Sequence, residues 1–488
     1  MVLDPETCYR ALKTHDTRFD GRFFVAVRTT RIYCRPVCRV KTPKAENCTF
    51  YSSAAAAEAS GYRPCLRCRP ELAPGNASVD AVERLARSAA GLIEEGLLDE
   101  HGVDGIAKRL GLTSRHLRRV FGAEFGVAPI AFAQTQRLLL AKQLIADTCL
   151  PLTEIAFAAG FQSVRRFDAL FQQRYRLSPR ALRRLPGNGA ALDAVQFELS
   201  YRPPYDWNSI TEFLSVRSIA GVEEVSSGVY RRIVRLLQGG QTHTGWIEVR
   251  PDGRKQTIRV LVSASLTKVI PAVLARVKHL FDLSCHPSEV NAVLGDIAAQ
   301  RPGVRVPGAF DGFEIAVRAV LGQQISVAAA RTLAGRLASA FGMPVSSPFQ
   351  SLTFAFPTAT ELADLECSEL AKLGILPARA RTIVEIAKAV AKRELELSPS
   401  ADAAETIQKL EAIPGIGHWT AHYIAMRALS WPDAFPHTDL ALKKALGEQN
   451  ARQILAAGEA WRPWRAYAVM HLWTAASTAQ GGKKWKCL

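Results

Sequence analysis

The 488-residue chain lacks the features that mark membrane and secreted proteins. No apolar run approaches the roughly 18 residues that a membrane-spanning helix needs. The N-terminal segment MVLDPETCYR lacks the order of charged and then apolar residues found in signal peptides. Ten cysteines are too few for a disulfide scaffold in a chain of this length. We therefore expect a cytoplasmic protein with reduced cysteines and no membrane partner.

Acidic residues are also in short supply. The 62 Lys and Arg outnumber the 45 Asp and Glu, which gives a formal net charge of +17, and both halves of the chain are basic. An excess of positive charge favours a polyanionic partner, because basic side chains that neutralise phosphates release bound counterions. Nucleic acid is the leading candidate, and a merely soluble basic protein is the alternative.

Two short stretches rich in Pro, Gly and small residues divide the chain, LAPGNAS near 72–78 and RLPGNGAA near 184–191. Between them the apolar residues follow a helical period throughout. Beyond the second stretch they alternate as in strands, with Pro-Asp-Gly between two such runs, and helical periodicity returns from about residue 308. We predict a multidomain α+β protein with four domains: a small α/β domain (1–75), an all-α domain (80–184), a small β-sheet/α domain (193–305) and an all-α domain (306–480).

Four cysteines form two close pairs, Cys34 with Cys38 and Cys65 with Cys68. The pattern is C-x3-C, a gap of 26 residues, and C-x2-C. Two such pairs on tight turns present four thiolates, which is the usual ligand set of a tetrahedral zinc site. The spacing predicts bound Zn²⁺. It leaves open whether the zinc only staples the fold.

The residues around these pairs, RTTRIYCRPVCRVKTPKAENCTFY and ASGYRPCLRCRP, resemble the methylphosphotriester-sensing domain of the Ada family over most of residues 4–72. The resemblance implies that Cys34 is both a zinc ligand and a methyl acceptor with a single turnover. Zinc keeps the sulfur in its nucleophilic thiolate form. Methylation would change the charge of the zinc and its four sulfurs from about −2 to about −1, which should strengthen DNA binding.

A doubled motif fills the second predicted domain. In GVDGIAKRLGLTSRHLRRVFGAEFG, Gly111 separates two short helices with apolar faces, and LTEIAFAAGFQSVRRFDALFQQRY repeats the plan around Gly160. One match could be an ordinary helical hairpin, but two in tandem resemble the double helix-turn-helix of AraC-type regulators. The resemblance implies a promoter-binding activator that also contacts RNA polymerase. The predicted DNA contacts lie within Ser114–Arg119 and Ser163–Arg166, and those we single out are Arg115, Arg118, Arg119, Arg165 and Arg166.

Near the C-terminus, LEAIPGIGHWTAHYIAMRAL carries Gly415 and Gly417 between two helices, where backbone N–H groups can approach a phosphate. Asp439 follows 22 residues after Gly417. Together they resemble the helix-hairpin-helix glycosylase superfamily. With FEIAVRAVLGQQIS at 313–326 and WRPWRAYAVMHLW at 461–473, the match extends to the AlkA family of 3-methyladenine glycosylases over about 290 residues.

This resemblance assigns roles to four residues. Asp439 would stabilise the sugar cation that forms when the N-glycosidic bond breaks, and Trp419, Tyr423 and Trp473 would hold the flipped-out base. Without the resemblance, an Asp ahead of LALKKAL is more often a helix N-cap than a catalytic residue, and aromatic residues on helices are more often core.

Two positions depart from the family pattern. Superfamily members that also cut the DNA strand carry a lysine where this chain has Trp419, so we expect a monofunctional glycosylase that uses water. Gln324 occupies the position of the apolar wedge that fills the gap left by the flipped base. The range of excised bases stays open for that reason. The chain has no Pro-Cys-His-Arg methyl acceptor, so direct repair of O6-alkylguanine is not implied.

The resulting hypothesis is a fusion of four parts: a zinc-dependent methyl sensor, a double helix-turn-helix, a small sheet domain and a helix-hairpin-helix glycosylase. Its expected partner is double-stranded DNA, at alkylated bases, methylphosphotriesters and promoter sites. The rival hypothesis is a transcriptional regulator with a structural zinc site and an inactive glycosylase half.

Overall fold

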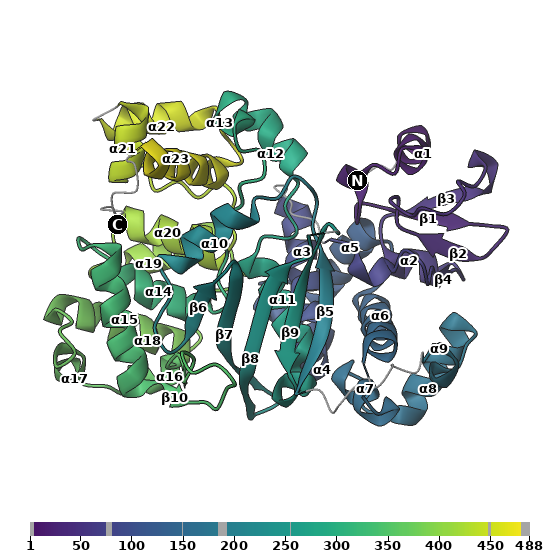
Figure 1. The fold of residues 1–488 in the computed structure, drawn as a ribbon, viewed down its shortest axis with the longest axis horizontal. Helices are drawn as coiled ribbons and strands as arrows, with labels where there is room; N and C mark the ends of the chain where they lie inside the picture. Colours follow the sequence, from purple (N-terminus) through teal and green to yellow (C-terminus); the bar gives the residue numbers. More distant parts are fainter. Residues whose placement is uncertain are drawn as a thin grey trace.

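The computed structural model describes residues 4–74, 81–148, 150–183, 193–253, 255–447 and 450–479. Figure 1 shows the N-terminal residues, in purple and blue, on one side of the molecule and the residues after 193, in teal to yellow, on the other. Within these described ranges, no helix combines the length and apolarity needed to cross a membrane.

The N-terminal group is a small sheet with two helices. Its strands have the order β3-β1-β2-β4, and only the pairing of β2 with β4 is parallel. Of the linker predicted near 72–78, residues 75–78 lie outside the described residues, and so does the whole linker predicted near 184–191. The elements are α1 (Pro5–Lys13), β1 (Phe24–Val27), β2 (Ile32–Cys34), β3 (Cys48–Tyr51), α2 (Ala54–Ala59) and β4 (Arg63–Pro64).

The second group is all helical, as its periodicity predicts. The turn glycines Gly111 and Gly160 both have positive φ, 66° and 86°. Thr113 and Ser163 cap the helices that follow these turns, because each side chain accepts a backbone N–H of the first turn. The helices are α3 (Ala81–Glu94), α4 (Leu97–Arg109), α5 (Ser114–Phe125), α6 (Pro129–Asp147), α7 (Leu152–Ala158), α8 (Val164–Tyr175) and α9 (Pro179–Leu182).

An antiparallel five-stranded sheet forms the third group, with strand order β5-β9-β8-β7-β6. The Pro-Asp-Gly signal lies at the connection of β8 and β9, as the alternating runs predict. The elements are β5 (Ala194–Ser200), α10 (Trp207–Ser215), β6 (Glu223–Ser226), β7 (Val229–Gln238), β8 (Gln241–Pro251), β9 (Thr257–Ser263), α11 (Ile270–Leu280), α12 (Pro287–Leu294) and α13 (Asp296–Ala299).

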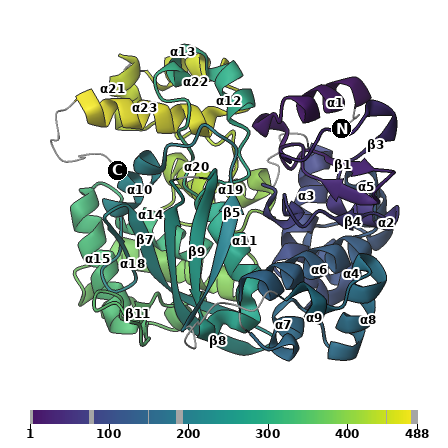
Figure 2. The ribbon, with the colours of Figure 1, turned by 45° about the vertical axis from the view of Figure 1, so that its right-hand side comes forward.

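The fourth group is helical apart from one ribbon of two short strands, β10 (Met343–Pro344) and β11 (Phe354–Ala355). In Figure 2 the last three helices lie above the sheet and the earlier ones beside it. The helices are α14 (Gly312–Leu321), α15 (Val327–Phe341), α16 (Ala359–Ala363), α17 (Cys367–Ala371), α18 (Pro377–Ala391), α19 (Ala403–Glu411), α20 (His418–Ala428), α21 (Leu440–Leu446), α22 (Ala451–Glu459) and α23 (Arg465–Ala479).

The third and fourth groups share one apolar core, which also takes in the second helix-turn-helix. The first helix-turn-helix and the N-terminal sheet have separate cores. Ion pairs connect the two sides of the molecule: Arg22 with Glu289 at 2.7 Å and Arg109 with Glu396 at 2.7 Å. The partly exposed pairs contribute little stability each, so apolar packing supplies most of the cohesion.

Candidate functional sites

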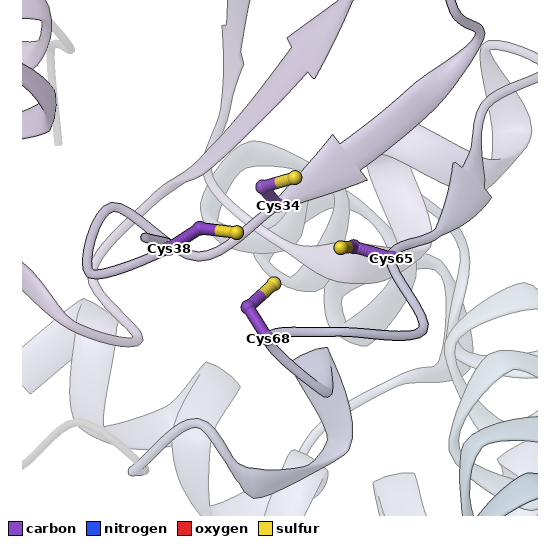
Figure 3. Close-up of side chains that lie close together, drawn as sticks. All are labelled: Cys34, Cys38, Cys65 and Cys68. Atoms are coloured by element: carbon purple, nitrogen blue, oxygen red, sulfur yellow. The ribbon is translucent and has the colours of Figure 1, made fainter. Parts of the chain in front are cut away.

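The four paired cysteines meet at one end of the N-terminal sheet. The parallel pairing of β2 with β4 places Tyr33 opposite Pro64, so Cys34 and Cys65, the next residues, emerge side by side. All four sulfurs lie within 4.8 Å of one another, and Figure 3 shows the four side chains converging. Sulfurs bound to Zn²⁺ at about 2.3 Å in a tetrahedron are about 3.8 Å apart. The cluster Cys34, Cys38, Cys65 and Cys68 therefore fits a zinc ion.

Backbone N–H groups also point at the sulfurs. The N–H of Arg35 donates to Sγ of Cys68 and that of Arg67 to Sγ of Cys65, both at 3.4 Å. Such donors stabilise thiolates and orient them toward a metal. The Arg35 guanidinium is buried and pairs with Asp20, with its Nε 2.8 Å from Oδ1. This ion pair fixes the loop that joins the first two cysteines.

The predicted DNA-contacting arginines lie on the two helices that follow the turn glycines. Helix α5 buries Leu117 and Phe121, and α8 buries Phe167 and Phe171. The opposite faces of these helices are solvent-exposed and basic, as recognition helices require. They carry Arg115, Arg118 and Arg119 on α5 and Arg165 and Arg166 on α8, all exposed.

Asp439 is buried, with 4% of its surface exposed, and its carboxylate accepts four hydrogen bonds. The indole Nε1 of Trp419 donates to Oδ2 at 2.9 Å, and that of Trp473 donates to Oδ1 at 3.0 Å. The backbone N–H groups of Ala441 and Leu442 also donate to Oδ1, at 2.8 and 3.0 Å. Asp439 is therefore the N-cap of α21 and, at the same time, the carboxylate against the predicted aromatic residues.

The aromatic rings form a continuous cluster around this carboxylate. Trp419 stacks on Tyr423 with ring centroids 5.2 Å apart, and Tyr423 lies 6.4 Å from Trp473. Phe213 of α10 stacks on Trp473 at 6.4 Å, although it belongs to the preceding domain. Phe213 is not among the site residues predicted from the sequence, because one Phe on a short amphipathic helix has no signal that separates a pocket residue from core.

Buried arginines lie behind the rings. Arg427 donates from Nη1 to the Tyr423 hydroxyl at 2.9 Å, and Arg217 lies 3.8 Å above the Phe213 ring. Burial alone would raise the pKa of Tyr423, but the charges of Arg427, Arg217 and Arg318 outweigh it and lower that pKa. These contacts hold the hydroxyl of Tyr423 and the face of Phe213 in place.

The predicted hairpin lies between α19 and α20. Gly415 has φ of +95°, and a Cβ there would lie 2.2 Å from Oγ1 of Thr382, so no other residue fits. Gln323 donates from Nε2 to the carbonyl of Gly415 at 2.8 Å. The hairpin is therefore bonded to the loop that carries Gln324, whose side chain is exposed and whose φ is +56°. Gly417 is also exposed.

Comparison with known proteins defines the class of each part. Residues 7–71 match the metal binding domain of Ada, and residues 106–185 match a helix-turn-helix domain. Residues 196–311 match the AlkA N-terminal domain, and residues 317–453 match the HhH-GPD superfamily of base excision DNA repair proteins. The chain therefore joins an Ada-type metal-binding module and a DNA-binding module to a base-excision module.

Individual relatives narrow this class. A probable bifunctional transcriptional activator/DNA repair enzyme AlkA from Mycobacterium tuberculosis is 40% identical over 486 residues, 96% of each chain. DNA-3-methyladenine glycosylase 2 of Escherichia coli is 35% identical over 57% of this chain and 96% of its own. The bifunctional activator Ada of E. coli is 36% identical over 26% of this chain and 35% of its own. The chain belongs to the family of bifunctional transcriptional activator/DNA repair proteins AlkA.

A solved structure supports the fold of the C-terminal half. The 3-methyladenine DNA-glycosylase of Archaeoglobus fulgidus aligns with a TM-score of 0.50 at 22% identity, over 58% of this chain and 99% of its own. The predicted fusion and its fold classes are confirmed. Zinc is confirmed as the cofactor by the Ada-type domain together with the converging sulfurs, and DNA is the partner of the helix-turn-helix.

Proposed function

We propose that this protein excises alkylated purines of the 3-methyladenine type from double-stranded DNA and uses water as the nucleophile. The observation that best supports this proposal is the buried Asp439 carboxylate, which accepts hydrogen bonds from the indoles of Trp419 and Trp473. Breaking the N-glycosidic bond of a flipped-out nucleotide leaves positive charge on the sugar, which a nearby carboxylate stabilises. An alkylated purine is already a good leaving group, so the pocket needs to supply little acid.

The four donors to Asp439 define its part in the reaction. They hold the carboxylate in one orientation. Oδ1 already accepts three hydrogen bonds, whereas Oδ2 accepts one, from Trp419, and keeps a lone pair that can orient a water molecule. Asp439 therefore acts by its charge on the sugar cation and, through Oδ2, can also orient the water. Trp419 cannot form the covalent amine intermediate of a lyase, so the strand stays uncut.

The test is release of 3-methyladenine and 7-methylguanine from methylated duplex DNA. Asp439→Asn should lower release by at least about a hundredfold, because a neutral amide cannot balance the sugar cation. The control is Asp402→Asn, which alters the N-cap of α19 without touching the pocket. If wild type releases no base while DNA binding persists, the regulator with an inactive glycosylase half is correct. Strand cleavage by the wild type would contradict the water mechanism.

We also propose that Cys34 accepts a methyl group from a methylphosphotriester. The Cys34 sulfur attacks the methyl carbon, the carbon–oxygen bond breaks, and the phosphodiester leaves with the electron pair. Zinc, when bound, supplies the thiolate form of that sulfur. Cys34 lies at the end of β2, which presents it directly to the other sulfurs. Methylation would make the cluster less negative and so favour its approach to DNA. The methylated protein would then activate promoters with RNA polymerase as its partner, in the cytoplasm and at the nucleoid.

Mass spectrometry after incubation with methylated DNA tests this step. One added methyl group should map to Cys34, and Cys34→Ser should abolish it. Cys48→Ser is the matched control, because Cys48 lies outside the cluster and is half-buried. Uptake on another cysteine would contradict the role of Cys34, and no uptake by a zinc-loaded wild type would mean that the zinc site is purely structural.

The four domain ranges also remain a proposal: 1–75, 80–184, 193–305 and 306–480. Each family match lies within one of them to within a few residues. Limited proteolysis should cut first at the two predicted linkers, near 72–78 and 184–191.

A further inference from the structure

In the glycosylase half, Leu376 is an exposed leucine close in the fold to the hairpin. Leu376 immediately precedes α18 and is 57% exposed, more than any other large apolar side chain among the described residues after 306. Its neighbour Ile375 is 2% exposed. The chain thus buries one apolar side chain of this turn and presents the next to solvent.

The turn that carries Leu376 is held rigidly. Arg336 of α15 donates to the carbonyl of Leu373 at 3.0 Å, and Gly374 adopts a φ of +86°. Pro377 is the first residue of α18 and restricts the residue before it to an extended backbone. The observed φ and ψ of Leu376, −60° and 142°, agree. Because this backbone is already fixed, little backbone entropy is lost when Leu376 inserts into a partner.

Hydrogen bonds connect this turn to the DNA-facing elements of the proposed glycosylase. Arg379, in the first turn of α18, donates to the carbonyl of Gln323, next to Gln324 in the wedge loop. Thr382, one turn further, donates to the carbonyl of Pro414 in the hairpin at 2.8 Å. Leu376 therefore belongs to the same surface as the wedge loop and the hairpin.

That surface lacks an apolar group at the expected wedge position, because Gln324 is polar. An amide side chain can enter the gap in a duplex, but it offers little apolar surface to the neighbouring bases. Proteins that unstack base pairs commonly insert Leu, Ile, Phe or Met, whose apolar surface replaces lost stacking. Exposed cations nearby, such as Arg381 on α18, can contact the flanking phosphates.

We propose that Leu376 is a second wedge, which inserts between base pairs beside the flipped-out nucleotide and supplies the apolar contact that Gln324 lacks. The proposal rests on the proposed glycosylase function. It makes Leu376 a positioning residue, which stabilises the open duplex without touching the reacting atoms.

The experiment measures unstacking and base release separately. Binding of a duplex with an abasic-site analogue and an adjacent 2-aminopurine should raise 2-aminopurine fluorescence for the wild type. Leu376→Ala should lose most of that rise and release base about tenfold more slowly from methylated DNA. Leu376→Met should keep both signals. Leu237→Ala is the matched control, because Leu237 is 76% exposed at the end of β7, away from the hairpin.

A rescue variant sharpens the result. Gln324→Leu combined with Leu376→Ala should recover fluorescence and base release, because the apolar wedge returns at the first position. If Leu376→Ala matches Leu237→Ala in both signals, the second wedge is wrong, and Leu376 serves another partner or none. If the wild type releases no base, the glycosylase function fails, while the fluorescence of the abasic duplex still decides whether Leu376 inserts.

Discussion

The zinc cluster and the aromatic pocket are both buried sites, yet the chain builds them differently. The cluster takes all its ligands from two short segments whose strands pair, β2 and β4. The pocket takes Phe213 from the sheet domain, Trp419 and Tyr423 from α20, Asp439 from the start of α21 and Trp473 from α23. A local site can be read from spacing, whereas an assembled site depends on the packing of a whole domain.

Of the changes predicted here, zinc removal should have the largest effect, and it should affect the zinc cluster but not the aromatic pocket. Binding of structural zinc contributes roughly 10–16 kcal/mol in small zinc modules. A chelator, or Cys38→Ser, should therefore unfold the N-terminal module while base release persists, because the cysteine cluster lies outside the core that the third and fourth groups share. Amide hydrogen exchange of residues 24–65 and base release from methylated DNA are the paired measurements. Loss of both together would show that the cluster supports the pocket.

Phe213→Ala tests the assembled site. Truncation of a buried Phe costs about 3–5 kcal/mol, and here it also removes the ring that stacks on Trp473. We expect lower stability in urea and slower base release. Phe197→Ala is the matched control, since Phe197 is equally buried in β5 but does not contact the pocket rings. Equal loss of base release in both variants would mean that stability alone, and not the stacking, explains the effect.

The same contrast explains what the sequence could predict. The cysteine pairs, the turn glycines Gly111 and Gly160, and the Pro-Asp-Gly connection are local signals, and the structure bears them out. Phe213 has no local signal, because it meets Trp473 only through the docking of two domains. The parallel pairing of β2 with β4 is equally unpredictable from the sequence, because pairing between distant strands produces no periodic pattern of residues.

Asp439 shows a subtler limit. From sequence alone, the helix cap and the pocket carboxylate are alternative roles for Asp439. The structure gives Asp439 both sets of contacts at once, because α21 begins against the indoles of Trp419 and Trp473. The sequence around Asp439 is the same for both roles. Only the packing of α21 against the two indoles shows that Asp439 has both.

Glu58 tests whether the stability of the zinc module depends on contacts with the next domain, as the cysteine cluster does not. It is buried, accepts a hydrogen bond from the hydroxyl of Tyr33 beside Cys34, and accepts another from Thr135 of α6. Burial raises the pKa of Glu58 to about 7. A folded-state pKa above the unfolded value of 4.5 gives stability that is present below pH 4.5 and is lost as the pH rises through 7.

The expected loss is about 3 kcal/mol between pH 4.5 and 8, from a shift of two to three pKa units. Glu58→Gln should remove this part of the pH dependence, because a neutral amide does not titrate. Urea unfolding of both proteins at a series of pH values gives the difference. If the unfolding free energies of the two proteins change with pH in the same way, Glu58 titrates alike in the folded and unfolded chains. The contact of Glu58 with α6 would then contribute nothing to the pH dependence of the module.

Trp473→Phe is the smallest of these changes, and it tests whether one hydrogen bond to Asp439 matters for base release. It keeps an aromatic ring against Phe213 but removes the N–H that donates to Asp439 at 3.0 Å. A hydrogen bond to a charged group contributes about 1.5–3 kcal/mol, so base release should slow by roughly tenfold to a hundredfold. Trp246→Phe, in the sheet domain, should leave it unchanged. If Trp473→Phe also has no effect, the remaining donors suffice to hold the carboxylate, and the pocket depends on Trp473 for its ring alone.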